Sequence, residues 1–483
     1  MGYVEGESRE QCVLFPESLD EYVEESNAVR AIDAFIRYVR FDELKFERAE
    51  PAETGRPGYD PRALLGILIW GHSNGVRSSR RLERECGRNV ELMWLTGKLR
   101  PDFKTICRFR QVNGEAIKEV LGQFRVWAGG AGLFGKELVA IDGSKFKAVN
   151  SKNRSFSLEK LKKMIEREKK SVERYLEELE EADREDEGEE KELTTAELKE
   201  KIATIEQYMK QREELLEEMK QSGEKQRTLT DPDARLMTTS KGTEVCYNVQ
   251  AAVDSKHKLI VAVEVSNDVE DQGQLGQMAQ EAKKGLGVDQ LTVVADGGYF
   301  CAEELHKCEE NGITTYVPVR RVVDRKRHGL FTQKEFFYDE SKDVYVCPQG
   351  AELRAFWQGR KRGRSGKQIK TYATKECAGC PLRSQCTKSK RGRTIERWVH
   401  QPTLARLEAR LRAHPEMIKR RKGLVEHPFG TIKVAMNHER LLLKGLKKVG
   451  TEISLSVISY NLKRVMKIMG MAAMIQSLSS QTA

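Results

Sequence analysis

The sequence lacks any long apolar run. The longest, Ala63–Trp70, has eight residues including a glycine, whereas a helix needs roughly 18 apolar residues to cross a bilayer. The first residues, Met1 to Glu5, show no basic segment followed by an apolar one, so no export signal is expected. Ten cysteines among 483 residues are too few and too scattered for a disulfide framework. These absences exclude membrane-spanning and secreted disulfide-bonded classes.

The charge is unevenly distributed along the chain. The formal net charge is +10, yet residues 158–227 hold 23 acidic and 16 basic residues, a net charge of −7. Residues 320–400 hold 21 basic and 8 acidic residues, a net charge of +13. A basic cluster of this size favours a polyanionic partner, most often nucleic acid, although basic solvated surfaces are also common.

The first 130 residues predict helices. Apolar residues recur at helical spacing from Val29 to Val39, and Asp60-Pro61 is typical of a helix start. Residues 101–110 predict a short capped helix whose polar face carries Thr105, Arg108 and Arg110. This region is either a DNA-binding helical domain, with Arg108 and Arg110 facing DNA, or a helical bundle with a solvated arginine face.

Further along, β-rich segments alternate with helical ones, which predicts an α/β core. Two apolar strands end on an aspartate, Asp142 and Asp296. Such strands can place two carboxylates side by side at one end of a sheet, and Mg²⁺ prefers oxygen ligands of this kind. The segments 247–254 and 259–265 predict a hairpin, and 274–286 predicts a helix.

Two segments interrupt this core. Residues 158–227 carry apolar residues at heptad spacing in two stretches, which predicts a helical hairpin of coiled-coil type, either a dimerisation arm or a tolerated insertion. Residues 320–400 form a basic insertion with four cysteines at Cys347, Cys377, Cys380 and Cys386. Four thiolates suit a structural zinc site; an iron–sulfur cluster or plain reduced cysteines are the alternatives.

Three motifs lie in order along the chain: Ala140-Ile141-Asp142-Gly143, Val294-Ala295-Asp296-Gly297-Gly298-Tyr299 and Val425-Glu426-His427-Pro428-Phe429-Gly430. In this order, with apolar strands leading into both aspartates, they resemble the DDE transposases of bacterial insertion sequences. The resemblance implies a fold of the α/β class with an RNase H-like, retroviral-integrase-like core built on a mixed sheet. It also implies that Asp142, Asp296 and Glu426 are the catalytic residues and the ligands of Mg²⁺ or Mn²⁺. The family's arginine four positions before the glutamate is Lys422 here, and its tyrosine seven before is Lys419.

Spacing alone gives Glu426 a second interpretation. Lys419, Lys422, Glu426 and Lys433 share one stripe of a helix, which is also the pattern of ordinary surface ion pairs. Pro428 removes a helix donor just after Glu426, so the glutamate is expected at a kink or helix start. The carboxylates of Asp231, Asp233 and Asp254 compete as metal ligands but are typical of turns.

The resemblance also implies DNA partners, namely the terminal inverted repeats of a mobile element and target DNA, and a homodimer on DNA in the bacterial cytoplasm. The candidate DNA-binding residues are Arg108, Arg110, Tyr299, Arg360, Arg362, Arg364, Lys419, Arg420, Lys422 and Lys433. Aromatics near the basic insertion, Phe356, Trp357 and Trp398, can stack on unpaired bases.

We therefore expect a helical DNA-binding domain at 1–130 and a catalytic domain at 131–483, interrupted by 158–227 and 320–400. The expected activity is metal-dependent cleavage at element ends followed by strand transfer. The alternatives are an RNase H-like nuclease or resolvase without strand transfer, and an inactive DNA-binding derivative.

Overall fold

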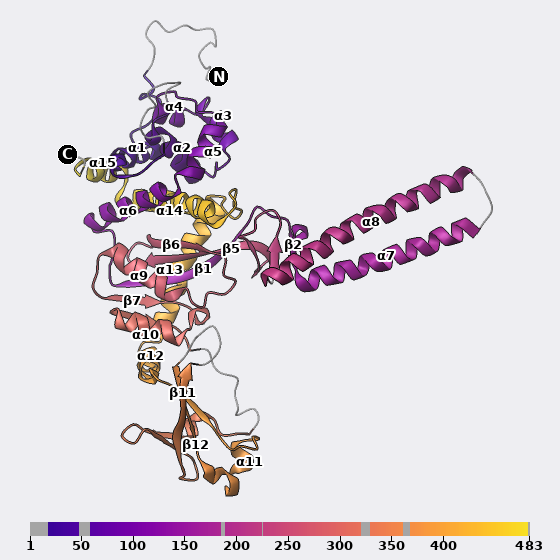
Figure 1. Cartoon of the computed structure of the whole chain (residues 1–483). Coiled ribbons are helices and arrows are strands. Elements are labelled where there is room, and N and C mark those ends of the chain that lie inside the picture. Colours follow the sequence, from indigo (N-terminus) through magenta and orange to yellow (C-terminus); the bar gives the residue numbers. More distant parts are fainter. Residues whose placement is uncertain are drawn as a thin grey trace, which may run out of the picture.

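The structure is a computed structural model that describes residues 18–47, 58–184, 189–224, 226–319, 329–360 and 368–481, without the side chains of residues 152, 181–195 and 360. Figure 1 shows an elongated molecule with helices at the end that holds both termini, a central sheet, a small β-rich module at the far end and a long helical hairpin projecting sideways. None of the helices within those ranges is both long and apolar enough to span a bilayer.

The N-terminal region is helical, as the sequence predicts. Three helix starts follow from side-chain caps: Asn27, Asp60 and Asp102 each accept a hydrogen bond from the first turn of their helix. The helices are α1 (Ala28–Tyr38), α2 (Pro61–Ser73), α3 (Ser79–Cys86), α4 (Val90–Thr96), α5 (Phe103–Val112) and α6 (Gly114–Gly130).

The central sheet is mixed. Its strands are β1 (Leu138–Lys147), β4 (Arg235–Thr239), β5 (Gly242–Asp254), β6 (Ile260–Ser266), β7 (Leu291–Val294) and β8 (Ile313–Tyr316). β5 pairs antiparallel with β1 on one side and with both β4 and β6 on the other, while β1, β7 and β8 run parallel. The predicted hairpin at residues 255–258 is confirmed, since the N–H of Lys258 donates to the carbonyl of Asp254 in that turn. The prediction that the first strand ends at Asp142 was wrong. β1 continues to Lys147, because its second half pairs with β5.

Helices cover the sheet. They are α9 (Leu275–Leu286), α10 (Ala302–Glu310), α12 (Gln401–Ala413), α13 (Glu416–Gly430), α14 (Leu446–Met469) and α15 (Met471–Ser479). A π-helical turn, Thr431–Ala435, follows α13. α9 packs on β6 and β5, and α13 packs on β1.

The C-terminal helix α14 joins the N-terminal helices to the sheet. It packs against α2 and α6 on one side and against β6 on the other, and one continuous hydrophobic core runs through all of them. Arg77, just before α3, pairs at 2.8 Å with Glu452 of α14, and both side chains are buried. On the sheet side, Asn461 accepts from the backbone N–H of Ile260 and donates to the carbonyl of the same residue. The two ends of the chain therefore pack in the same core (Figure 1).

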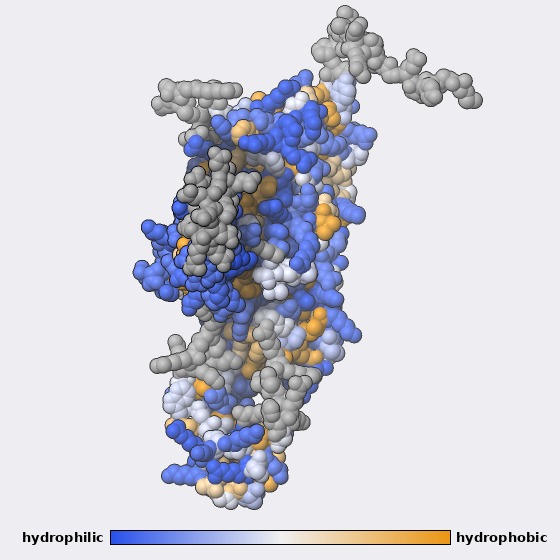
Figure 2. Space-filling model, turned by 90° about the vertical axis from the view of Figure 1, so that its right-hand side faces the viewer, coloured by the Kyte–Doolittle hydropathy of each residue, from blue (hydrophilic) through white to orange (hydrophobic). Residues whose placement is uncertain are grey.

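The helical hairpin consists of α7 (Leu158–Arg184) and α8 (Glu189–Ser222), and it leaves the body through the short strand pair β2 (Ser155–Ser157) and β3 (Gln226–Thr228). Lys169 pairs with Glu213 across the two helices at 3.3 Å. At the base, Phe156, Leu161 and Met219 form a small buried cluster. Figure 2, which views the hairpin end-on, shows a predominantly hydrophilic surface on the described part of it.

The β-rich module at the far end has its own sheet. Its strands are β9 (Phe337–Asp339), β10 (Val344–Val346), β11 (Glu352–Arg360), β12 (Gln368–Ala373) and β13 (Ile395–Trp398), all antiparallel in the order β13-β12-β11-β10-β9. The segment between Cys347 and Cys377 contains the hairpin β11–β12. Five residues form the buried core of the module: Phe336, Tyr345, Leu353, Tyr372 and Ile395.

Candidate active site

Asp142 and Asp296 lie level on neighbouring strands. Ala140 of β1 pairs with Val294 of β7 in parallel register, and each aspartate follows its strand residue by two positions. Beyond β7, Asp296 caps a short 3₁₀ turn, Gly297–Tyr299, and accepts a hydrogen bond from the N–H of Gly298 at 2.6 Å. The sequence-based expectation that the two carboxylates meet at one edge of the sheet follows from this register.

The carboxylate of Asp142 is largely buried and has a cation beside it. Arg421 of α13 places its Nη1 atom 2.9 Å from Oδ2 of Asp142, and the backbone N–H of Gly143 donates to Oδ1 at 3.0 Å. Burial raises the pKa of Asp142 to about 6, against the opposing effects of Arg421 and the Gly143 N–H, and the negative charges of Asp296 and Asp271 add to the rise. Asp142 is thus a partly buried carboxyl group with a raised pKa and other carboxylates nearby. Perturbed pKa values of this kind are common at functional sites.

Glu426 is not part of this cluster. Its side chain is 64% exposed and pairs loosely with Lys422 at 3.8 Å. Arg421 and Glu426 are five residues apart in α13, about 140° around the helix axis at 3.6 residues per turn, so a helix that turns Arg421 toward Asp142 turns Glu426 toward solvent. Glu426 does not lie at a helix start, because α13 begins at Glu416 and continues through Pro428 to Gly430.

Two of the three ligands expected for a divalent cation are present at this site. Among the residues that the structure describes, no three His, Cys, Asp or Glu side chains stand close enough together to hold a metal ion. Asp142 and Asp296 supply only oxygen ligands, and Mg²⁺ is commonly held by one or two carboxylates together with water and substrate phosphates. The two aspartates therefore fit a magnesium-type cation, and the expected third ligand is the part that the geometry does not supply.

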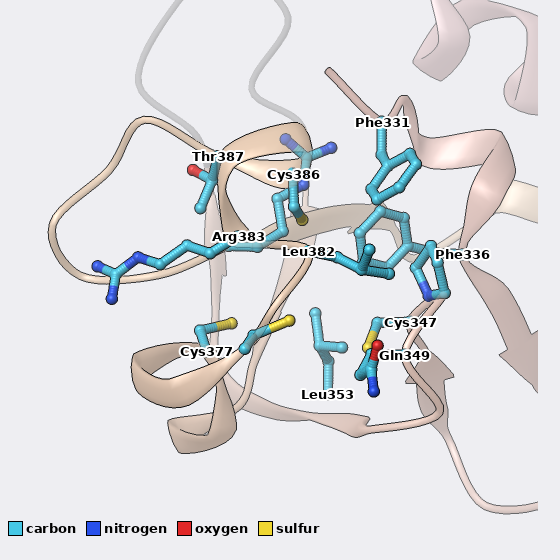
Figure 3. A pocket seen from close by; sticks show the side chains of 13 residues that line it. Phe331, Phe336, Cys347, Gln349, Leu353, Cys377, Leu382, Arg383, Cys386 and Thr387 are labelled. Atoms are coloured by element: carbon cyan, nitrogen blue, oxygen red, sulfur yellow. The ribbon is translucent and has the colours of Figure 1, made fainter. Parts of the chain in front are cut away.

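The four cysteines of the β-rich module line one pocket (Figure 3). Cys347 and Cys380 each begin a tight turn: the carbonyl of Cys347 accepts from Gly350 N–H at 2.8 Å and that of Cys380 from Arg383 N–H at 3.1 Å. Burial raises the pKa of the Cys377 thiol, and Cys380 and Cys347 lie close enough to raise it further. Cys386 closes the pocket from the short helix α11 (Arg383–Cys386).

Two segments of the chain match known protein families. Residues 346–466 match a family described as a transposase DDE domain, and residues 17–112 match a family described as a transposase domain of otherwise undefined type. By these two matches the chain resembles DDE transposases at residues 17–112 and 346–466, outside the segments that carry Asp142 and Asp296. The match to the DDE domain spans the cysteine-lined pocket, Arg421 and Glu426, and the second match spans α1 to α5.

Other comparisons add less about this chain. Among solved structures it is similar to the piggyBac transposase in a synaptic complex with hairpin DNA, at 10% identity and a TM-score of 0.33, over 95% of this chain and 80% of that one. A likeness at this level supports no conclusion about fold. The comparison with curated proteins gives no match.

Three candidate DNA-binding residues make contacts inside the protein, contrary to expectation. Arg110 is 3% exposed and donates to the carbonyl of Arg77, because α5 packs that face inward. Tyr299 is fully buried, and its hydroxyl donates to Gln250. The ammonium of Lys433 donates to the carbonyl of Lys145 at 2.7 Å and lies over the ring of Phe146, and burial lowers its pKa.

The other candidates in the described region are exposed. Arg108 on α5 and Lys419, Arg420 and Lys422 on α13 all face solvent. In the β-rich module, Phe356 and Trp357 are 65% and 43% exposed, whereas Trp398 is buried and cannot stack on a base. Arg362 and Arg364, and the side chain of Arg360, lie outside the described residues.

The competing aspartates bond to the protein backbone. Asp254 accepts hydrogen bonds from the N–H groups of Gly135, Lys136 and Lys256. Asp231 accepts from Tyr247 and from the backbone N–H of Gly445, and Asp233 accepts from that of Leu446 at the start of α14. Each of these carboxylates stabilises a turn or a helix start, as their sequence context indicates.

Two residues of the site escaped the sequence reasoning. Arg421 lies next to the position where the family's arginine is expected, and the alternation of buried residues along α13 would have pointed to it: Leu424, Val425 and Pro428 share its side of the helix. Asp271 lies in the loop before α9, where it resembles any solvated loop acid. Only the fold brings it beside β1 and β5.

Proposed function

We propose that this transposase cuts DNA at the ends of a mobile element and joins the freed ends to target DNA. The observation that carries the proposal is the placement of Asp142 in β1 beside Asp296, which follows the neighbouring parallel strand β7, in a chain that resembles DDE transposases at residues 346–466. Phosphoryl transfer of this kind depends mainly on positioning and on electrostatic stabilisation of the reacting phosphate.

The topology supports an RNase H-like core as part of this proposal. The sheet runs in the order β6-β5-β1-β7-β8, with the first three strands antiparallel and β1, β7 and β8 parallel. Ligands in sheets of this type bind outside the carboxyl ends of the parallel strands. Asp296 lies just beyond the carboxyl end of β7, and Asp142 lies in β1 beside it. We also keep as a proposal the division into an N-terminal DNA-binding domain at 1–130 and a catalytic domain at 131–483.

In the proposed mechanism, Asp142 and Asp296 would hold Mg²⁺ or Mn²⁺, which when bound supplies Lewis-acid activation of the attacking oxygen and stabilisation of the leaving one. Cleavage joins a water oxygen to phosphorus and releases a 3′-hydroxyl. Transfer then joins that 3′ oxygen to a target phosphorus and releases a target 3′-hydroxyl. Arg421 lies close enough to Asp142 to neutralise charge on a phosphate held there.

Glu426 can act as a metal ligand in this mechanism only if the conformation of α13 changes. Pro428 interrupts the hydrogen bonding of the helix two residues after Glu426, and the π-helical turn Thr431–Ala435 follows directly. Both features weaken the regular bonding of this part of the helix. We propose that the segment turns when DNA is bound, so that Glu426 reaches the aspartates and Arg421 reaches the phosphate.

DNA contact by the β-rich module is the second part of the proposal. Besides two exposed aromatic side chains, the module carries exposed cations: Arg354, Lys388, Lys390 and Arg391. Phe356 and Trp357 lie on β11 next to a β-bulge, where the strand is irregular and its side chains are turned outward. Cations bind phosphates and exposed rings stack on bases, so this face suits the DNA of an element end.

A structural zinc ion at the cysteines completes the module in our proposal. The five-residue core is too small to stabilise such a sheet by itself, and small modules of this kind commonly depend on a metal. Cys347, Cys377, Cys380 and Cys386 line one pocket and are the all-thiolate type of ligand that zinc accepts. Because no three of them stand close enough to hold a metal ion in the described structure, zinc would have to draw the thiolates together. Two ends of an element must be held together for transfer, so we further propose that the chain acts as a homodimer on DNA.

The test is a strand-transfer assay with the full-length protein, Mg²⁺ and an oligonucleotide carrying an inverted repeat from the flanking DNA. We expect Asp142→Ala, Asp296→Ala and Glu426→Ala each to lose joined product by at least a hundredfold. Asp289→Ala is the matched control, because this exposed aspartate precedes the same strand β7 at its other end. Cleaved but unjoined product from the wild type would instead indicate a nuclease.

A further inference from the structure

Asp271 is the hub of a hydrogen-bond network behind the two aspartates. Its Oδ1 atom accepts from Asn248 Nδ2 at 2.7 Å and from Gln250 Nε2 at 2.9 Å, both on β5. Lys145 of β1 places its ammonium 3.4 Å from the same oxygen. One carboxylate from the loop before α9 thus joins the two central strands of the sheet.

The network continues to the strand end that carries Asp296. Gln250 accepts a hydrogen bond from the hydroxyl of Tyr299, whose side chain is fully buried. Tyr299 ends the short 3₁₀ turn that Asp296 caps. Asp271 is therefore connected to the Asp296 turn by continuous contacts through the side-chain amide of Gln250 and the hydroxyl of Tyr299.

The connection to Asp142 runs through Gly143. A Cβ atom on Gly143 would lie 2.6 Å from Nε2 of Gln250 and 2.7 Å from Oδ1 of Asp271, closer than real contacts allow. Because side chains alternate along a strand, the Gly143 position faces the opposite side of the sheet from Asp142. The glycine thus lets the Asp271 network lie directly against the backbone that carries Asp142.

We propose that Asp271 is a positioning residue of the active site, which fixes β1 and the Asp296 turn relative to each other so that Asp142 and Asp296 bind a divalent cation together. This inference rests on the proposed function, since it assumes that the two aspartates bind the cation. Groups that orient metal ligands from behind typically contribute 10–100-fold to metal affinity. The network also gives the glycine after Asp142 a physical role, because any side chain there would displace Asp271 or Gln250.

The test measures Mn²⁺ binding to the full-length protein by calorimetric titration, without DNA and without a reaction. We expect Asp271→Ala to weaken Mn²⁺ binding by at least about tenfold. Asp271→Asn is expected to stay within about threefold of the wild type, because the amide oxygen can still accept from Asn248 and Gln250. Gly143→Ala should weaken binding as Asp271→Ala does. Gly276→Ala is the matched control, since a Cβ there meets only an ordinary contact at 3.5 Å.

The outcomes separate this inference from the function on which it rests. If Asp142→Ala bound Mn²⁺ as tightly as the wild type, the cation site itself would be wrong. If Asp142→Ala lost binding while Asp271→Ala and Gly143→Ala kept it, only the positioning role would be overturned. A lower melting temperature with unchanged Mn²⁺ affinity in Asp271→Ala would likewise overturn it, because Asp271 would then support the fold alone.

Discussion

The guanidinium of Arg421 lies 2.9 Å from the carboxylate of Asp142, with both side chains largely buried. Three exposed cations surround Arg421 in the sequence, Lys419, Arg420 and Lys422, yet none of them is paired with Asp142 in the described structure. The helix α13 thus offers one cation to the candidate active site and presents the others to solvent. A phosphate bound at the aspartates would meet Arg421 first.

We expect Arg421→Ala to reduce strand transfer by at least tenfold, because it removes the only cation that the structure shows paired with Asp142. Lys422→Ala is the matched control, since that ammonium is on the same helix but its side chain is 73% exposed. The control should change the rate by about threefold or less, as exposed charges usually contribute little. Equal losses from both variants would contradict the role given to Arg421.

Metal binding should depend on pH through Asp142. The pKa of this carboxyl is raised to about 6 by burial and by the neighbouring Asp296 and Asp271 charges, so it holds a proton at pH 5 and has lost it at pH 7. A protonated carboxyl cannot bind the cation. Mn²⁺ affinity should therefore rise about tenfold per pH unit up to pH 6 and level off above it.

Calorimetric titrations with Mn²⁺ at pH 5, 6, 7 and 8 check this dependence. Asp142→Asn serves as the control, because it carries no titratable group at that position and should show weak binding with little change across the series. A wild-type affinity that stays constant between pH 5 and 7 would contradict the raised pKa.

The cysteine pocket should hold one zinc ion per chain. We expect elemental analysis of purified protein to find this zinc, and Cys377→Ser and Cys380→Ser to lose it. Cys308→Ser is the control, because Cys308 is a buried cysteine on α10, outside the pocket. Removal of zinc should also lower the melting temperature, since binding free energy of a structural metal is folding free energy. Full zinc content in Cys377→Ser would refute the site.

The β-rich module should govern the salt dependence of DNA binding. Each phosphate contact adds about 0.9 to the slope of log K against log salt. Replacing the exposed Lys388, Lys390 and Arg391 by alanine should therefore reduce the slope by about 2 to 3. The control replaces Lys199, Lys201 and Lys210, which are exposed on the acidic helix α8. The slope for this control should equal that of the wild type in fluorescence anisotropy titrations.

The contact between α14 and the N-terminal helices depends on Glu452. This buried carboxylate pairs with Arg77 at 2.8 Å and accepts from the backbone N–H groups of Leu442 and Leu443. Although burial acts to raise it, His438, Arg110 and Arg77 hold the pKa of Glu452 at about 2. We expect Glu452→Ala to lower the free energy of unfolding by about 3–5 kcal/mol, because it leaves Arg77 buried and unpaired.

Urea unfolding followed by circular dichroism measures this effect. Glu439→Ala is the control, because Glu439 pairs with Lys241 at the surface, where both side chains are more than half exposed, and should cost about 1 kcal/mol or less. Since the pKa of Glu452 is lowered, its stabilisation is present above its ordinary pKa of 4.5 and is lost as pH falls toward 2. A Glu452→Ala variant as stable as the wild type would show that this contact is not needed.

Local signals in the sequence predict the elements well, because they act over a few residues. Asn27, Asp60 and Asp102 mark true helix starts, and the turn between β5 and β6 lies where the polar residues 255–258 indicate. The residues whose roles were wrong depend on packing over long distances. Arg110 looks like a solvent-facing arginine until Arg77 is brought against it, and the sequence around Tyr299 does not show that Gln250 of β5 accepts its hydroxyl in the core.

The candidate site shows the same division. The register of β1 and β7 that aligns Asp142 with Asp296 could be expected from two strands that carry the same motif. The orientation of α13 could not, because a rotation of the helix by one residue decides whether Arg421, Lys422 or Glu426 faces the aspartates. The contribution of Asp271 was equally hidden, because Asp271 lies in a loop that is separated from β1 by the helical hairpin and the three strands β4, β5 and β6.

The helical hairpin leaves and re-enters the body at one point, where Ser155 of β2 pairs with Thr228 of β3. At its base, Phe156, Leu161 and Met219 form a buried cluster that is separate from the main hydrophobic core. We therefore expect that a change in the length of α7 and α8 beyond this cluster leaves the positions of Asp142 and Asp296 unchanged. Natural relatives could carry a longer, shorter or absent hairpin on the same strand pair, which makes this position a natural place to attach a fluorophore or a fused protein without disturbing DNA chemistry.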